Sequence, residues 1–134
     1  MTDDPRYAVP PPVWRHRLRV EVDDGEARCV VALDEGGEVV GMASAGITRD
    51  DDAPTSWELY SINTVPAVHG SGAADDLLRA VVGPRDASLW VLTTNARAQG
   101  FYRRHGFTAD GAARAHDGTG AEEIRMVRYG AARG

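Results

Sequence analysis

Two segments of this 134-residue chain combine residue types and spacings that could do chemistry. Residues 69–74, His-Gly-Ser-Gly-Ala-Ala, come directly before a predicted helix. Glycine lets a backbone approach a ligand closely, and the first N–H groups of a helix lack intrahelical partners, so such a segment can hold a phosphate. Residues 95–107 place Tyr102 on a short, arginine-containing predicted helix. Together the segments indicate a phosphate-bearing cofactor with an ionisable side chain beside it.

The glycine segment is ambiguous when it is considered alone. An ordinary strand-to-helix turn explains it at least as well as a ligand site, because a lone Gly-x-Gly is a weak signal. The segment lacks the third glycine of a dinucleotide fingerprint, and no Gly-Lys-Ser/Thr follows it. The sequence therefore supports neither a Rossmann nor a P-loop assignment.

Alternating and helical apolar patterns predict the elements that position these segments. They indicate an α/β (α+β) fold with a mixed sheet flanked by helices. Pro12 near the first turn, with apolar residues spaced by four, predicts a short helix in front of the sheet. The predicted strands are Arg28–Asp34, Glu38–Ile47, Trp57–Val65, Ser88–Thr93, Phe107–Arg114 and Glu122–Tyr129, and the predicted helices are Val13–Val22, Ala73–Val82 and the segment from Asn95 to Gly106.

Length and composition favour one globular domain over residues 1–134, with residues 1–12 as a flexible arm. The net charge of −5 argues against nucleic acid or an anionic membrane as the main partner. No apolar run reaches membrane-spanning length and no signal-peptide pattern opens the chain, so the cytoplasm is the expected location. The lone Cys29 is expected in the core. Residues 50–54 read as a solvated acidic loop, with no spaced ligand set for a metal.

Considered together, the motifs resemble those of a known family. Residues 58–66, Glu-Leu-Tyr-Ser-Ile-Asn-Thr-Val-Pro, followed by the glycine segment, resemble the central strand and CoA loop of GNAT-superfamily acyl-CoA N-acyltransferases. That loop has the form Gln/Arg-x-x-Gly-x-Gly/Ala, and residues 69–74 read His-x-x-Gly-x-Ala. Residues 89–107 look like the family's fourth sheet-and-helix unit, and residues 116–126 look like the terminal hairpin of its bacterial branch. The resemblance covers residues 28–129.

The resemblance implies a GNAT-like, mostly antiparallel sheet, acetyl-CoA as co-substrate and no metal. It implies that the backbone of Ile62, Asn63 and Thr64 hydrogen-bonds the pantetheine arm in the manner of an added strand. Asn95 would contact the same arm while capping its own helix. The residues that the family places at the pyrophosphate are His69, Gly70, Ser71, Gly72, Ala73, Ala74 and Asp75.

The resemblance also implies a general acid. Tyr102 would protonate the departing CoA thiolate. A phenol with an unperturbed pKa near 10 is protonated at neutral pH and can donate that proton. The alternative is a core tyrosine packed beside Phe101 and Phe107, which the same spacing allows.

A base must remove a proton from the acceptor amine before the amine can attack the thioester, and in this family a carboxylate often does so through water. Glu58 stands where some members place that base. A glutamate at the start of a strand is also an ordinary edge residue, so both interpretations stay open. His69, His105 and His116 are rivals for the base on pKa grounds alone.

The glycine segment departs from the family pattern in its charge. His69 replaces the usual Gln or Arg, and Ser71 takes a position that is often basic. Asp75 stands where Arg or Lys is common, and Asp76 follows it. Two carboxylates in the first turn favour the helix dipole but oppose a pyrophosphate, so weaker CoA binding is expected. Compensating charge near the 3′-phosphate would come from Arg97, Arg103 and Arg104.

Two further departures concern the acceptor side and the second helix. The family generally begins with a strand and one or two helices that roof the acceptor site, whereas only Val13–Val22 can stand in for them here. An open pocket and a pocket completed by a second subunit in a homodimer both fit this shortened N-terminal region. Gly100 lies inside the second predicted helix, where it costs about 1 kcal/mol relative to Ala. Close approach of a ligand or a neighbouring strand would explain it.

The resemblance implies an N-acetyltransferase that transfers the acetyl group of acetyl-CoA to a primary amine of a small molecule or peptide by direct attack. The alternative is a GNAT-like module that binds CoA, or nothing, without turnover. The acidic first turn supports the module, whereas Tyr102, Asn95 and Glu58 support the enzyme. Several acceptors fit the sequence: Asp50–Asp52 could attract a cationic amine, and a peptide N-terminus or a lysine fits equally well.

Overall fold

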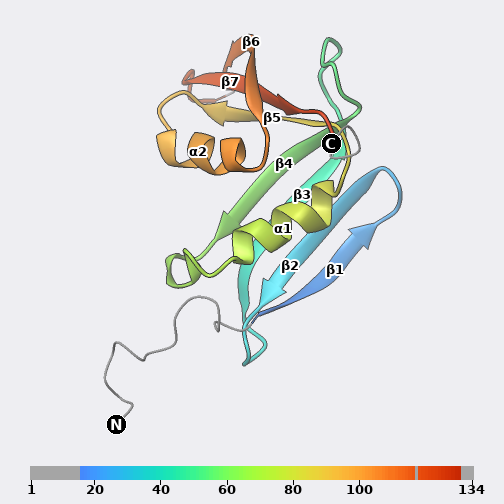
Figure 1. Cartoon of the computed structure of the whole chain (residues 1–134), viewed down its shortest axis with the longest axis vertical. Coiled ribbons are helices and arrows are strands. Elements are labelled where there is room, and N and C mark those ends of the chain that lie inside the picture. The colour runs from blue at the N-terminus through green and yellow to red at the C-terminus, as the bar shows by residue number, and fades with distance from the viewer. Residues whose placement is uncertain (1–15, 117, 131–134) are drawn as a thin grey trace. The chain divides into compact units, whose positions relative to one another are not determined.

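The computed structural model describes residues 16–116 and 118–130, so the predictions for residues 1–12 and for the start of the Val13–Val22 helix lie outside the described residues. The strands form a seven-stranded, mostly antiparallel sheet in the order β1-β2-β3-β4-β5-β7-β6 (Figure 1). This confirms the predicted fold class. The elements are β1 (Arg17–Asp23), β2 (Ala27–Leu33), β3 (Val39–Ile47), β4 (Trp57–Thr64), the 3-10 helix η3 (Pro66–Val68), α1 (Ala73–Val82), β5 (Ala87–Leu92), α2 (Ala96–Arg104), β6 (Thr108–Ala115) and β7 (Glu122–Arg128).

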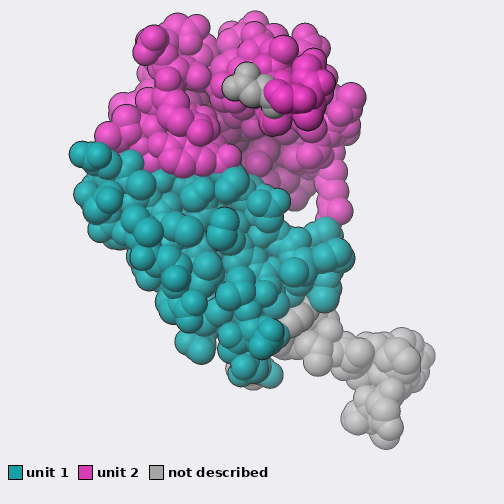
Figure 2. Space-filling view, turned by 180° about the vertical axis from the view of Figure 1, so that it is seen from behind, with its two compact units in different colours: residues 1–45, 61–83 teal, residues 46–60, 84–134 magenta. Residues whose placement is uncertain are grey.

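The chain divides into two compact units, coloured separately in Figure 2. Unit 1 contains residues 1–45 and 61–83, and unit 2 contains residues 46–60 and 84–134. The boundary falls within β3 and β4, so each unit holds one part of these two strands. The prediction of a single domain over the whole chain remains a prediction.

The prediction of a helix over Val13–Val22 is wrong from Arg17 onward, because this segment is strand β1 and pairs antiparallel with β2. Its apolar residues also alternate along the chain, which is the two-residue period of a strand. The turn that joins β1 to β2 places Gly25 at φ +87°, and the Asp24 carboxylate accepts two backbone N–H groups at 3.0 Å. Cys29 on β2 is half-buried, whereas the sequence predicted a thiol in the core.

The core of unit 1 forms where α1 packs against β2 (Figure 1). Helix α1 has the predicted bounds, and its apolar side chains recur at helical spacing on the buried face. Gly83, with φ +61°, follows its last residue, as a helix C-terminus favours. Buried side chains of this unit include Val30, Leu33, Leu77, Leu78, Val81 and Val82.

In unit 2, β5 lies between β4 and β7 and is parallel to β4 but antiparallel to β7. Phe107 and Met126 are fully buried and Leu89 is 1% exposed. Helix α2 begins after Asn95, whose side chain accepts the Ala98 N–H at 3.0 Å, as predicted for a capping residue. The terminal hairpin is β6 and β7, close to its predicted bounds.

Gly41 on β3 is the glycine that packs most tightly against the end of β4 and α1. A Cβ at this position would lie 2.9 Å from the Leu77 Cδ1 and 2.9 Å from the Thr64 Cγ2. It would also lie 3.2 Å from the Asn63 carbonyl oxygen. Gly41→Ala should therefore lower the free energy of unfolding by about 1–3 kcal/mol, as overpacking does in other cores. Urea denaturation followed by circular dichroism measures the change.

Gly100→Ala is the matched control for that substitution. No heavy atom outside the helix lies within 4 Å of a Cβ built at Gly100, so a neighbouring strand does not explain this glycine. Alanine should raise the free energy of unfolding by up to about 1 kcal/mol, because it has the higher helix propensity. Equal stability of the Gly41→Ala variant and the wild type would show that β3 and β4 adjust without strain.

Candidate active site

The predicted phosphate segment lies in unit 1, between β4 and α1. Gly70 and Gly72 have φ angles of +83° and +92°, in the left-handed region that favours glycine, as expected for this loop. Gly72 is the N-cap of α1 and provides no side-chain cap. The Ser71 hydroxyl accepts the Ala73 N–H at 3.2 Å, so one donor at the start of the helix already has a partner. In general the first N–H groups of a helix can bind an anion, and the predicted role of this segment requires that property.

The acidic first turn of α1 carries its own compensation. The Asp76 carboxylate lies 2.7 Å from the His16 Nε2 and 3.4 Å from the Arg79 guanidinium. The Arg79 cation, and His16 when protonated, offset part of the negative charge that would repel a pyrophosphate. The sequence pattern did not reveal the His16 contact, because His16 and Asp76 are 60 residues apart.

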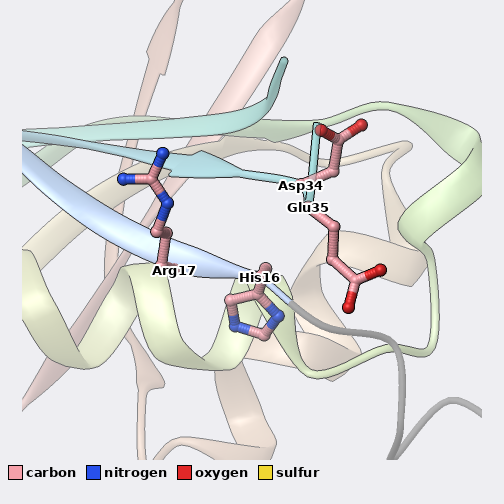
Figure 3. A pocket seen from close by; sticks show the side chains of 4 residues that line it. All are labelled: His16, Arg17, Asp34 and Glu35. Carbon is pink, nitrogen blue, oxygen red and sulfur yellow. The ribbon is translucent and has the colours of Figure 1, made fainter. Parts of the chain in front are cut away.

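A small pocket of about 140 Å³ also lies in unit 1, and Figure 3 shows its lining side chains. His16, Arg17, Asp34 and Glu35 form this lining. None of them is a predicted site residue. The lining of this pocket therefore includes none of the predicted site residues, although its His16 contacts Asp76 in the first turn of α1.

The end of β4 carries the three residues predicted to bind pantetheine. Strands β4 and β5 are parallel, and their register consists of the single pair Glu58↔Ser88. That register includes none of Ile62, Asn63 and Thr64. A strand edge without a partner can pair its backbone with an extended ligand, as the predicted role requires.

Helix α2 holds its predicted residues in unit 2. Asn95 is exposed, and the Gln99 amide donates to the carbonyls of Leu92 and Thr93 at 3.0 and 3.1 Å, which ties the helix to the end of β5. Arg104 is exposed, and its guanidinium lies 5.7 Å from the Phe101 ring centroid. The Gln99 hydrogen bonds hold α2 against the end of β5, and Asn95 remains exposed.

Tyr102 packs in the core, as one of its two interpretations requires, and its role as a general acid stays a prediction. Its side chain is 9% exposed, and its ring centroid lies 5.5 Å from that of Phe101 and 6.0 Å from that of Phe107. Burial raises the pKa of Tyr102 to about 12, so the phenol is protonated at physiological pH. The ring is part of the core, and the protonated hydroxyl is a hydrogen-bond donor.

Glu58 is 1% exposed and is held by Arg49, which is not among the predicted site residues. Glu58 Oε1 accepts the Arg49 backbone N–H at 3.0 Å and Nε at 3.3 Å, while Oε2 accepts Nη2 at 2.9 Å. The hydrogen bond to Glu58 raises the pKa of Arg49 further above its ordinary value. The sequence signal that could have predicted this ion pair is the opposite charge of the two residues, because Arg49 follows one predicted strand and Glu58 lies at the start of the next.

The acidic loop after β3 is not uniformly solvated, so that expectation is wrong for Asp50. Its side chain is 14% exposed, and its carboxylate accepts the Trp90 indole N–H at 2.7 Å. Arg114 and Arg125 each lie 3.7 Å from it. By contrast, Asp52 is 80% exposed and bonds Arg125 at 3.1 Å. The carboxylates of Asp50 and Asp52 are therefore paired with arginines of the protein itself.

The predicted residues thus fall into two sets. Unit 2 holds the proposed acid and base, Tyr102 and Glu58, together with Asn95 and Arg104. Unit 1 holds the predicted pantetheine residues at the end of β4 and the predicted pyrophosphate residues from His69 to Asp75. Across the described range, no group of three or more His, Cys, Asp or Glu side chains is placed to hold a metal ion, and no helix is long and apolar enough to cross a membrane.

We compared the sequence with the models of known protein families. Residues 25–109 match the model of the acetyltransferase (GNAT) domain. The chain belongs to the GNAT family. This confirms the predicted resemblance, and the GNAT domain supports an acyltransferase activity. The comparison with curated proteins found no match.

Solved structures resemble about four fifths of this chain. A histone acetyltransferase HPA2 and related acetyltransferase from Corynebacterium glutamicum is 26% identical, with a TM-score of 0.62 over 79% of this chain and 66% of that chain. Nourseothricin acetyltransferase is 25% identical, with a TM-score of 0.62 over 82% of this chain and 69% of that chain. NAA60 from Arabidopsis thaliana, in complex with a bisubstrate analogue, is 19% identical with a TM-score of 0.62 over 78% and 76%, and shows the fold alone. The alignments span about two thirds to three quarters of these relatives.

Proposed function

We propose that this GNAT protein is an N-acetyltransferase that moves the acetyl group of acetyl-CoA to a primary amine. The observation that carries the proposal is the path of unit 1 from β4 to α1. The last residues of β4 lie outside the β4–β5 register, and the chain then passes through two left-handed glycines to the start of a helix. An extended amide-bearing arm followed by a pyrophosphate matches this order of backbone edge and anion site.

Unit 2 supports the chemical steps of the proposal. The Glu58 carboxylate would take a proton from the acceptor ammonium, directly or through water, which leaves a neutral amine. The amine would attack the thioester carbonyl. The nitrogen of the tetrahedral intermediate would lose its second proton to water, and collapse of the intermediate would break the C–S bond. The Tyr102 hydroxyl would donate to the departing thiolate. The products are the N-acetyl amine, CoA and one released proton.

Binding of acetyl-CoA tests the first half of this proposal. At about 100 times its dissociation constant, the ligand should raise the free energy of unfolding by about 2.7 kcal/mol. Thermal shift and calorimetry measure this, with desulfo-CoA as a probe that keeps the pyrophosphate and lacks the thiol. A panel of primary amines, assayed for acetylation by mass spectrometry, tests the second half. Absence of stabilisation by acetyl-CoA would contradict the proposal.

One observation favours a second candidate, a GNAT domain that binds acyl-CoA without turnover. The Glu58 carboxylate accepts three hydrogen bonds from Arg49, so the proposed base is already occupied. Under this alternative acetyl-CoA would stabilise the protein, yet no amine in the panel would be acetylated. The same two measurements therefore separate the candidates.

A further inference from the structure

The pairing of Glu58 with Arg49 joins a buried anion to an exposed cation. The Glu58 side chain is 1% exposed, whereas that of Arg49 is 60% exposed. An exposed arginine side chain loses little when it moves into water, because the strength of an ion pair depends on how well both partners are shielded. A carboxylate left buried without a partner is strongly disfavoured. Arg49 can therefore leave this position only if another donor replaces it.

The two oxygens of Glu58 are held in different ways. Oε1 accepts the backbone N–H of Arg49 at 3.0 Å, and this bond does not depend on the arginine side chain. Oε2 accepts only the Nη2 of the flexible guanidinium, at 2.9 Å. Movement of the side chain would thus leave the carboxylate anchored through Oε1 and expose Oε2. This geometry makes Oε2 the exchangeable side of the pair.

An aromatic ring completes the surroundings of the guanidinium. The Arg49 Cζ lies 4.2 Å from the centroid of the Tyr60 ring, within the range of a cation–π contact. The ring is fixed in place, since the Tyr60 hydroxyl donates to the Ile47 carbonyl oxygen at 2.6 Å. A carboxylate oxygen beside a fixed aromatic face is a combination that binds ammonium groups as well as guanidinium groups.

We propose that Glu58 Oε2 and the Tyr60 ring form a subsite for the ammonium group of the acceptor, and that the Arg49 side chain fills this subsite until an acceptor replaces it. The inference rests on the proposed function and extends it to a class of acceptor. The acceptor binds as a cation, exchanges with Arg49 and is thereby placed against the base that takes its proton. Arg49 acts as a positioning residue and competes with the acceptor.

Competition has a measurable consequence for binding. If part of the protein holds Arg49 in the subsite, the apparent dissociation constant of an ammonium ligand is its intrinsic value divided by the fraction of protein in which the subsite is free. Arg49→Gln removes the competing cation and retains a polar side chain. It should bind n-butylammonium about two- to fivefold more tightly, the range expected for an ion pair with one exposed partner. A purely structural Arg49 would leave this affinity unchanged or weaken it.

Nuclear magnetic resonance of the wild-type protein tests the exchange directly. The Arg49 Nε–H signal, assigned by its loss in Arg49→Lys, should shift progressively as n-butylammonium chloride is added. The neutral isostere 1-butanol and sodium chloride at equal ionic strength should not move it. Arg19, whose Nε donates to Glu21, is the matched internal control and should be unaffected. The inference is overturned if the Arg49 signal of the wild type stays fixed at n-butylammonium concentrations that saturate the Arg49→Gln variant. It is also overturned if neither protein binds n-butylammonium.

Substitutions at Tyr60 test the aromatic half of the subsite. This test remains valid even if the Arg49→Gln variant does not fold. Tyr60→Leu should weaken binding of n-butylammonium about two- to fivefold, the size of an exposed cation–π contact. Tyr60→Phe retains the ring and should bind nearly as the wild type does. Equal affinities of the Leu and Phe variants would overturn the role of the ring.

These outcomes are distinguishable from failure of the proposed function. If amines are acetylated while the Arg49 signal does not respond to n-butylammonium, the subsite is wrong and the acetyltransferase stands. If n-butylammonium displaces Arg49 but acetyl-CoA neither binds nor reacts, the cation subsite stands and the proposed enzyme does not.

Discussion

Replacement of Tyr102 by phenylalanine should lower kcat for acetyl transfer by about 100-fold and leave the dissociation constant of acetyl-CoA nearly unchanged. Phenylalanine keeps the ring, and with it the contacts of Tyr102 to Phe101 and Phe107. It removes only the hydroxyl that would donate to the thiolate. Steady-state kinetics with the best amine of the panel, and calorimetry with acetyl-CoA, measure the two effects.

The expected size follows from the burial of Tyr102. A general acid contributes about 10²–10⁴-fold, and most when its pKa lies near the working pH. The pKa of Tyr102 is raised to about 12, so this phenol is a weaker acid than an ordinary tyrosine and the lower end of the range applies. The same shift keeps the hydroxyl protonated, so its ionisation should not limit kcat between neutral pH and a pH of about 10.

The half-exposed Tyr129 provides a control for the loss of a phenol. Tyr129→Phe should retain the kcat of the wild type. An unchanged kcat in Tyr102→Phe would remove this hydroxyl from the mechanism and leave Tyr102 as a core residue. A loss of acetyl-CoA binding in that variant would instead show that the hydroxyl positions the ligand.

Apolar spacing and glycine positions predicted those elements whose structure depends on residues close together in the sequence. Helix α1 has the predicted bounds because helical apolar spacing and the glycines on either side agree. The segment at Val13–Val22 failed because two periods competed: Leu18 and Val22 fit a helix, whereas Leu18, Val20 and Val22 fit a strand. Pairing with β2 and the Asp24-Gly25 turn decided for the strand. Tertiary pairing thus overrode a short helical pattern.

The site residues also divide into those that one stretch of sequence reveals and those that only folding brings together. The resemblance identified the glycine segment, Asn95 and Tyr102 because their types and spacing are visible in one stretch of sequence. It did not show Arg49, His16 or the partners of Asp50, which act on residues brought near by folding. An arginine beside a glutamate is informative only once the strands are paired, so the electrostatics of the site could not be read from the chain alone.

Replacement of Arg125, which lies in unit 2 together with Glu58, should have a large effect on stability. Arg125→Met should lower the free energy of unfolding by about 3–5 kcal/mol, as the loss of one partner of a buried ion pair does. The Arg125 side chain is 7% exposed, and it bonds Asp110 at 2.7 Å and Asp52 at 3.1 Å. Burial alone would lower the pKa of Arg125, but the hydrogen bonds to these carboxylates outweigh burial and raise it. Urea denaturation measures the loss.

A double-mutant cycle separates the uncompensated charge from lost packing. The Asp110 side chain is 16% exposed, so Arg125→Met leaves its carboxylate largely shielded from water without its cation. Adding Asp110→Asn should therefore recover part of the lost stability, whereas independent sites would give additive losses. Arg19→Met is the control for removal of an exposed arginine, and it should change stability by less than about 0.5 kcal/mol. A loss in Arg125→Met no larger than in this control would contradict the prediction.

The stability of this network also bears on the proposed base. Asp50 directly follows Arg49 and is held by the Trp90 indole N–H, with Arg125 3.7 Å away. Loss of Arg125 should loosen the loop that presents Arg49 to Glu58, because one of the cations beside Asp50 is gone. In the folded Arg125→Met variant the Arg49 Nε–H signal should therefore exchange faster with water than in the wild type. An unchanged exchange rate would show that Trp90 and Arg114 suffice to hold the loop.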